Sequence, residues 1–346
     1  MTITEPPLAT SQASSRACVM PPPPRVVSGI TPSGSLTLGN YLGALRRFVG
    51  GQHTTQGFFF VADLHATTTE HQPARLREVT LETAALFFAA GLKAEHSTVF
   101  VQSHVPAHVE LAYLLESTAY VGELSRMIQF KDKGGRPRTR ASLFTYPCLM
   151  AADILLYDTQ TVPVGGDQDQ HVELCRDVAE RFNREYADTF VVPRLDKAAL
   201  AARVADLLAP TAKMSKSAPP AAAGVIRMLD APDTIRRKIS RAVTDSYARV
   251  RYDSVAQPGL SNLLDIIAAI THQSPHDVAT GFSSYAGVKR SCADHVVDAL
   301  TPIQRRYADL SRDRDHLMSL LESGAARARV AAAPVLARAR DAMGLV

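Results

Sequence analysis

Residues 213–217, near the middle of the chain, read Lys-Met-Ser-Lys-Ser, and their types and spacing suit phosphate chemistry. The two lysines, Lys213 and Lys216, are three residues apart, and the Ala-Pro-Pro that follows cannot continue a regular helix or strand. An ammonium group is a compact charge on a flexible stem, so two of them on a short loop fit a polyphosphate. A solvated basic loop has the same pattern. The phosphate interpretation therefore needs a second phosphate-binding segment upstream.

A candidate for that second segment lies at residues 31–40, which read Thr-Pro-Ser-Gly-Ser-Leu-Thr-Leu-Gly-Asn. The apolar run 25–30 before it predicts a strand, and apolar residues with helical spacing follow from Tyr41. A loop of small residues between a strand and a helix offers backbone N–H groups and the positive end of the helix to a phosphate. The loop matches neither the dinucleotide fingerprint nor the P-loop fingerprint, so a plain strand-to-helix turn remains the alternative.

Alternating strands and helices are expected to position these two segments. Further strands are predicted at 58–63, 98–102 and 161–164, and helices at 73–91, 107–117, 143–157 and 172–183. This alternation predicts an α/β fold with a Rossmann-like doubly wound parallel sheet. Beyond the lysine segment the alternation stops, and the patterns predict an all-α part with helices at 233–243, 262–270, 292–309 and 315–343.

The expected organisation has three parts. Residues 1–24 form a disordered Pro-rich leader, 25–223 a Rossmann-like catalytic domain, and 224–346 a helical domain. Within the second part, residues 126–140 form a flexible basic loop with adjacent glycines in its middle. A solvated surface loop and a contact with phosphate or RNA explain that loop equally well.

Polar residues stand where predicted strands end, and one stands inside a predicted apolar helix. Asp63 and His65 follow the second strand, and the polar cluster 165–171 follows the fourth. Open α/β sheets bind ligands at these strand ends, although a helix cap and a loop histidine are structural alternatives. Asp153 lies inside the apolar segment 143–157, where an ionised carboxylate needs a partner. That partner is either another protein group or a ligand held between Tyr146 and Met150.

Composition excludes several classes of protein. The chain has 346 residues, 46% apolar and 21% charged, which is typical of a soluble globular protein. It has no apolar run of the roughly 18 residues that a membrane span needs, and its start lacks the basic and apolar regions of a signal peptide. The four cysteines form no CxxC pair, so neither a metal site nor a disulfide framework is expected, and a reducing cytoplasm fits.

The net charge is +4, and all of the excess lies in residues 224–346, which carry 17 basic and 13 acidic residues. Residues 1–223 carry the remaining 21 basic and 21 acidic residues. The excess is a mild indication of a nucleic-acid partner for the C-terminal part.

The two signature segments together resemble those of the class I aminoacyl-tRNA synthetases, and most closely those of the tryptophanyl-tRNA synthetase family. Residues 213–217 match the KMSKS signature in full. Thr37-Leu38-Gly39-Asn40 matches the tryptophanyl variant of the HxGH signature. The segments 146–157, 162–165 and 167–171 also match, and the resemblance covers about residues 26–346.

The resemblance implies a reaction, its substrates and its partners. L-Tryptophan would be adenylated by MgATP and then transferred to the 3′ end of tRNA(Trp). Mg²⁺ would arrive with ATP, with no dedicated protein metal site. A cytoplasmic homodimer is implied, and the helical domain would bind the tRNA anticodon.

The resemblance also assigns roles to individual residues. Catalysis is expected from Lys213, Lys216, Thr37 and Asn40. ATP contacts are expected from Thr31, Ser33, Gly39, Asn40, Lys133, Gly165, Asp167, Lys213, Ser215 and Lys216. Tryptophan contacts are expected from Val27, His65, Tyr146, Met150, Asp153 and Gln168. Asp153 would accept the indole N–H, Met150 would pack on the ring, Tyr146 and Gln168 would hold the α-amino group, and His65 would lie near the carboxylate.

Two positions depart from the family pattern, and two alternative functions remain open. Many relatives have Gln where Thr31 stands and an aromatic residue where Val27 stands. A tyrosyl-tRNA synthetase would share the fold and the chemistry, but Met150 and Asp153 argue against it. A paralogue that binds RNA without charging it is the other alternative, and the two intact signatures argue against that.

Overall fold

A parallel sheet of five strands forms the centre of the computed structural model, which describes residues 23–135, 137–163, 169–196 and 204–346. The strands are β1 (Arg25–Ile30), β2 (Gln56–Val61), β3 (Ser97–Val101), β4 (Thr161–Pro163) and β5 (Arg194–Asp196), in the order β3–β2–β1–β4–β5. The order reverses at β1, so a crevice opens between the carboxyl ends of β1 and β4. The expected Rossmann-like sheet is confirmed, and β5 is an additional strand.

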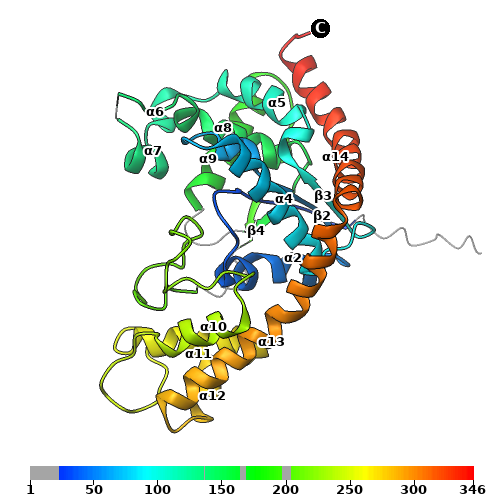
Figure 1. Ribbon diagram of the computed structural model, residues 1–346. Coiled ribbons are helices and arrows are strands. Elements are labelled where there is room, and N and C mark those ends of the chain that lie inside the picture. Colours follow the sequence, from blue (N-terminus) through cyan, green and yellow to red (C-terminus); the bar gives the residue numbers. More distant parts are fainter. Residues whose placement is uncertain (1–22, 136, 164–168, 197–203) are drawn as a thin grey trace, which may run out of the picture.

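Helices cover both faces of the sheet and continue beyond it (Figure 1). The helices that follow β1 and precede the C-terminal helical part are α1 (Leu38–Asn40), the π-helix η1 (Tyr41–Leu45), α2 (Arg46–Gly51), α3 (Asp63–Ala66), α4 (Pro73–Ala89), the 3₁₀ helix η2 (Gln102–His104), α5 (Ala107–Glu116), α6 (Val121–Leu124), α7 (Ile128–Lys133), α8 (Ser142–Leu155) and α9 (Asp169–Glu185). The prediction of a flexible loop at 126–140 was wrong in part, because the helix α7 lies within that segment.

The strand β2 shows why both faces of the sheet are apolar. Side chains alternate between the two faces of a strand. Phe58 therefore stacks on Tyr157 on one face, with ring centroids 4.4 Å apart. Phe59 stacks on Phe48 on the other face, also at 4.4 Å. The helices α5, α8 and α9 cover the first face, and α2 and α4 cover the second.

The C-terminal part is helical, as expected, and consists of α10 (Pro232–Ser240), α11 (Pro258–Thr271), α12 (Pro275–Thr280), α13 (Tyr285–Arg312) and α14 (Arg314–Ala342). Helices α10, α11 and α12 form a group below the sheet, and α13 leads from that group back to it (Figure 1). Helix α14 then packs along β3 and α5. The helical part therefore shares apolar contacts with the sheet. Among the described residues, no helix is long and apolar enough to cross a membrane.

The helix α14 covers the edge strand β3 at very short range. A Cβ at Gly324 would overlap the backbone carbonyl of Val99, so only glycine allows this approach. Arg327 donates a hydrogen bond from Nη2 to the carbonyl of Ser97 over 3.0 Å, at the start of the same strand. The helix thus shields an exposed edge that would otherwise be open to pairing with another chain.

Replacing Gly324 by Ala should therefore lower the free energy of unfolding by about 1–3 kcal/mol, because the helix must move off β3. Thermal unfolding measures this change. Gly50 in α2 is the matched control, since an added Cβ there meets nothing within 4 Å. Gly50→Ala should leave stability unchanged or raise it by up to about 1 kcal/mol. Equal melting temperatures for the two variants would contradict the close approach of α14.

Candidate active site

The first signature segment is held by a reciprocal cap at the start of α1. The backbone N–H of Asn40 donates to Thr37 Oγ1 over 3.4 Å, and Asn40 Oδ1 accepts from the backbone N–H of Thr37 over 3.0 Å. Thr37 Oγ1 also donates to Asn40 Oδ1 over 3.1 Å. Because Thr37 is fully buried, its hydroxyl bonds to Asn40 and is not exposed to solvent. The Asn40 side chain is thereby fixed in one orientation, with its amide nitrogen outside the cap.

The structure brings the lysine segment onto the loop after β1. The ammonium of Lys216 donates to the carbonyl of Thr31 over 2.6 Å, across 185 residues of sequence. The Lys216 carbonyl also lies where a Cβ of Gly34 would be, so glycine is required there. Burial, together with the nearby charge of Lys213, lowers the pKa of Lys216 to about 8. Two segments that were predicted to act together are therefore in contact at the carboxyl end of β1.

Only some of the remaining residues expected near ATP lie in the described part of the chain. Ser33 and Ser215 are exposed beside this contact, and Gly39 has room for a Cβ, so packing alone does not require glycine there. The residues Gly165, Asp167 and Gln168 and the side chain of Lys133 lie outside the described part of the chain. Their expected roles therefore stay predictions.

A second cluster surrounds Asp153, which is only 4% exposed. Its Oδ1 accepts from Gln102 Nε2 over 2.7 Å and from His108 Nδ1 over 2.6 Å, and its Oδ2 accepts from His65 Nε2 over 2.8 Å. His108 Nε2 in turn accepts from the Tyr157 hydroxyl over 2.8 Å, which places the ring proton on Nδ1. Asp153 thus has protein partners on both of its oxygens.

These partners keep the buried carboxylate ionised. Burial raises the pKa of Asp153, but the hydrogen bonds from His108 and His65 outweigh it and hold the pKa below the ordinary value. A carboxylate can accept about four hydrogen bonds, and the described residues supply three. Of these, only the bond from His65 goes to the second oxygen, so that oxygen can accept from one more donor. A ligand N–H is the group that such a site accepts.

The other residues expected around the amino acid lie on α8 and β1. Met150 is half-buried next to the Asp153 network on α8, and Val27 is buried on β1 in the same apolar cluster. The Tyr146 hydroxyl is bonded to His171 Nε2 over 2.7 Å, and burial raises the pKa of Tyr146 to about 12. The hydroxyl therefore stays protonated at neutral pH.

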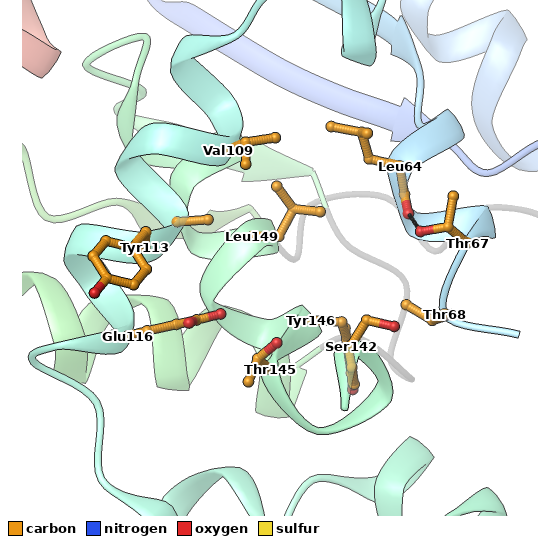
Figure 2. Close-up of a pocket in the computed structure, with 11 residues that line it drawn as sticks. Leu64, Thr67, Thr68, Val109, Tyr113, Glu116, Ser142, Thr145, Tyr146 and Leu149 are labelled. Atoms are coloured by element: carbon orange, nitrogen blue, oxygen red, sulfur yellow. Dashed lines mark hydrogen bonds between the residues drawn. The ribbon is translucent and has the colours of Figure 1, made fainter. Parts of the chain in front are cut away.

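Tyr146 also lines a cavity of about 320 Å³ between α3, α5 and α8. Figure 2 shows this cavity with Val109 and Tyr113 of α5 on one side and Leu64 of α3 on the other. Tyr146 is the one residue of its lining that was expected in a site. The cavity therefore adjoins the predicted amino-acid pocket through a single side chain.

Sequence reasoning missed three members of the Asp153 network, namely Gln102, His108 and Tyr157. Gln102 directly follows β3, so the rule that ligands gather at strand ends could have found it. His108 is the second residue of α5, and the buried position of that histidine is visible only in three dimensions. Asp63, by contrast, has a structural role. It accepts hydrogen bonds from the backbone N–H and the hydroxyl of Ser103 in η2 over 3.0 and 2.6 Å.

Comparison with known proteins identifies the class. Residues 21–301 match the family model described as tRNA synthetases class I (W and Y), and the chain belongs to that family. It is 50% identical over 328 residues to tryptophan–tRNA ligase 1 of Streptomyces coelicolor, covering 93% of this chain and 97% of the relative. It is 48% identical to tryptophan–tRNA ligase of Caldanaerobacter subterraneus subsp. tengcongensis, with 93% and 98% covered.

Solved structures agree with this assignment. Tryptophanyl-tRNA synthetase from Mycoplasma pneumoniae aligns with a TM-score of 0.85 at 34% identity, over 93% of this chain and 98% of that one. The enzyme from Campylobacter jejuni, in complex with ADP and tryptophan, aligns with a TM-score of 0.76 at 31% identity, over 93% and 100%. The family resemblance expected from the signatures is confirmed.

Replacing His108 by Leu should lower the free energy of unfolding by at least about 2 kcal/mol at pH 7, because the buried carboxylate loses a donor and Tyr157 loses an acceptor. Asp153 has a lowered pKa in the fold, so its contribution exists above the pKa of the unfolded chain and is lost as pH falls through the folded pKa. The difference between the variant and the parent chain should therefore shrink toward acid pH. Urea unfolding over a pH series measures it.

The exposed His71 provides the control, and His71→Leu should be neutral at every pH. A His108→Leu defect that does not change between neutral and acid pH would mean that lost packing, not the carboxylate, causes it.

Proposed function

We propose that this chain is a tryptophan–tRNA ligase. It activates L-tryptophan with MgATP, releases pyrophosphate, and transfers the tryptophan to the 3′ end of tRNA(Trp). The observation that carries the proposal is the contact between Lys216 and Thr31, because it joins the KMSKS segment to the loop that leads from β1 into the other signature. The names of the relatives that are 48–50% identical support tryptophan as the amino acid.

Adenylation requires cations and backbone donors beside the phosphates. The tryptophan carboxylate attacks the α-phosphorus in line, a P–O bond forms, and the bond to pyrophosphate breaks. Negative charge grows on the α-phosphoryl oxygens and on the leaving group. Lys213 and Lys216 would stabilise that charge, and Asn40, oriented by Thr37, would hold the nucleotide at the start of α1. Mg²⁺ would come with ATP, and the described residues contain no group of three or more side chains that could hold a metal.

The remaining expected ATP contacts extend the same nucleotide site. Thr31, Ser33, Gly39 and Ser215 surround the contact between the two loops. Lys133, Gly165 and Asp167 are proposed from the family resemblance alone.

The fourth acceptor position of Asp153 would take the indole N–H. Met150 and Val27 would supply apolar contact, and Tyr146 and Gln168 would hold the α-amino group. The hydrogen bond from His65 to Asp153 changes the role that we propose for His65, from a contact with the substrate carboxylate to orientation of the acceptor. Phenylalanine would leave this acceptor unpaired, and that penalty makes the site selective.

A homodimer is supported by exposed apolar side chains around the cavity of Figure 2. On α5, Tyr113 is 69% exposed and lies one turn after the exposed Val109. Tyr120, Val121 and Ile128, in and beside α6 and α7, are also exposed apolar side chains. A second copy of the chain would cover this surface. Sedimentation that shows only a monomer at micromolar concentration would remove the dimer.

The helical part is proposed to bind the tRNA anticodon. The loop between α10 and α11 presents Tyr247, which is 66% exposed, and the exposed Arg249 on either side of Ala248 at φ 54°. Gln257 and Tyr285 fix this loop by donating to Asp245. An aromatic ring and a guanidinium on a fixed loop suit an unstacked RNA base. Unchanged tRNA affinity in a Tyr247→Ala variant would remove this contact.

The cytoplasm is the compartment that fits this function. The described cysteines Cys148, Cys175 and Cys292 are buried free thiols. Burial raises the pKa of Cys148 and Cys292 to about 12, so these thiols stay protonated and unreactive.

Exchange of pyrophosphate into ATP tests the function directly. Tryptophan should support exchange, and tyrosine and phenylalanine should support at least about a thousandfold less, because each leaves a buried acceptor unpaired or crowded. Exchange with tyrosine alone would make the chain a tyrosyl enzyme. Exchange with none of the twenty amino acids, combined with tRNA binding, would favour the non-charging paralogue.

The pKa of Lys216 gives a pH prediction. The ammonium is charged below about pH 8 and loses its charge above it, so kcat/KM for ATP should fall as pH rises from 7 to 9. Lys216→Arg keeps its charge over this range and should give a flat profile at a lower level. Pyrophosphate exchange at saturating tryptophan measures both. Parallel profiles for the two proteins would exclude Lys216 as the titrating group.

A further inference from the structure

The guanidinium of Arg227 makes a second link between the lysine segment and the loop after β1. Its Nη2 donates to the carbonyls of Ala218 and Pro219, directly after the lysine segment, over 2.8 and 3.1 Å. Its Nη1 donates to the carbonyl of Ser35, in the loop after β1, over 3.3 Å. One side chain therefore contacts both loops.

The backbone at Arg227 is fixed where it crosses the first signature. The backbone N–H of Leu38 donates to the carbonyl of Ile226, and that of Met228 donates to the carbonyl of Leu36, both over 2.9 Å. Ile226 and Met228 are fully buried. Since side chains alternate in extended backbone, Arg227 points away from the core.

A carboxylate strengthens this anchor. Asp230 Oδ2 accepts from the backbone N–H of Arg227 over 2.9 Å and from Lys238 Nζ over 2.7 Å. The charge of Asp230 is therefore balanced by Lys238, and the Arg227 guanidinium is left to contact the loops.

We propose that Arg227 is a positioning residue that holds the lysine loop closed on the loop after β1. Lys216 binds the lysine segment to the carbonyl of Thr31, and Arg227 links the residues directly after that segment, Ala218 and Pro219, to the carbonyl of Ser35. A guanidinium has five donors in a rigid plane, so it can serve carbonyls on both loops at once. The proposal rests on the proposed role of the lysine loop in binding the phosphates of ATP.

The role differs from that of a residue that contacts substrate. All of the Arg227 side-chain donors described here go to backbone carbonyls. Its removal should therefore change how often the loop is closed, not the chemistry in the closed state. ATP use should suffer while tryptophan binding, which depends on the Asp153 network, should not.

The test is Arg227→Met, which keeps the apolar stem and removes the donors. kcat/KM for ATP in pyrophosphate exchange should fall about tenfold or more, the effect of losing one hydrogen bond to a charged group. The Kd for tryptophan should stay within about twofold, which also shows that the variant folds. Amide hydrogen exchange of residues 214–223 should become faster.

Two further variants show whether the guanidinium itself is responsible. Arg227→Lys should recover part of the ATP activity, and millimolar guanidinium added to Arg227→Ala should recover part of it as well. Arg312→Met removes an exposed arginine that pairs only with Asp309 among the described residues, and it should match the parent chain.

The outcomes separate this proposal from the function on which it rests. Wild-type ATP kinetics and amide exchange in Arg227→Met, with Lys216→Ala impaired, would overturn the role of Arg227 alone. Wild-type activity in both variants would overturn the role of the lysine loop. Equal losses for ATP and tryptophan in Arg227→Met would mean that Arg227 supports the fold generally, which also overturns the proposal.

Discussion

A charged carboxylate inside an apolar core is the constraint on which the rest of the candidate site depends. Asp153 can stay ionised there only because Gln102, His108 and His65 supply donors. His65 and Gln102 lie in α3 and η2, the short helices that follow the neighbouring strands β2 and β3, and His108 lies in α5. The sheet, α3, η2, α5 and α8 must therefore keep their relative positions. Among the described residues the Asp153 carboxylate makes three of about four possible hydrogen bonds, and the proposed selectivity for tryptophan would depend on the fourth.

The proposed nucleotide-binding half of the site has a different constraint, which is repulsion between its cations. Its cations must be close together before a phosphate arrives, although like charges repel. Backbone carbonyls hold the lysine loop in place: Lys216 donates to the carbonyl of Thr31, and Arg227 donates to Ser35 and to the residues directly after the loop. Carbonyl oxygens offer partial negative charge without the full charge of a carboxylate, which would compete with ATP. A loop held in this way remains available to an anion.

How much the sequence predicts depends on how local each signal is. The strands β1 to β4 and the longer helices follow from apolar periodicity, and both signatures were recognisable because their residues are contiguous. The strand β5 was missed because three residues, two of them charged, give no strand pattern. The docking of α14 on β3 was missed because the buried face of the helix from Gly324 onward is mostly alanine. These small residues allow a close approach but give a weak apolar pattern.

The roles of Thr37 and His65 show the same limit at single residues. Family resemblance placed both beside a substrate, yet each makes its described side-chain bonds to another site residue, Thr37 to Asn40 and His65 to Asp153. A pattern of residues shows that a position matters but not whether it acts directly. The difference lies in hydrogen-bond partners far apart in sequence, such as the 88 residues between His65 and Asp153. In the proposed function two groups would meet substrate, Asn40 with the lysines and Asp153. Their neighbours Thr37 and His65 would orient Asn40 and Asp153 rather than bind substrate themselves.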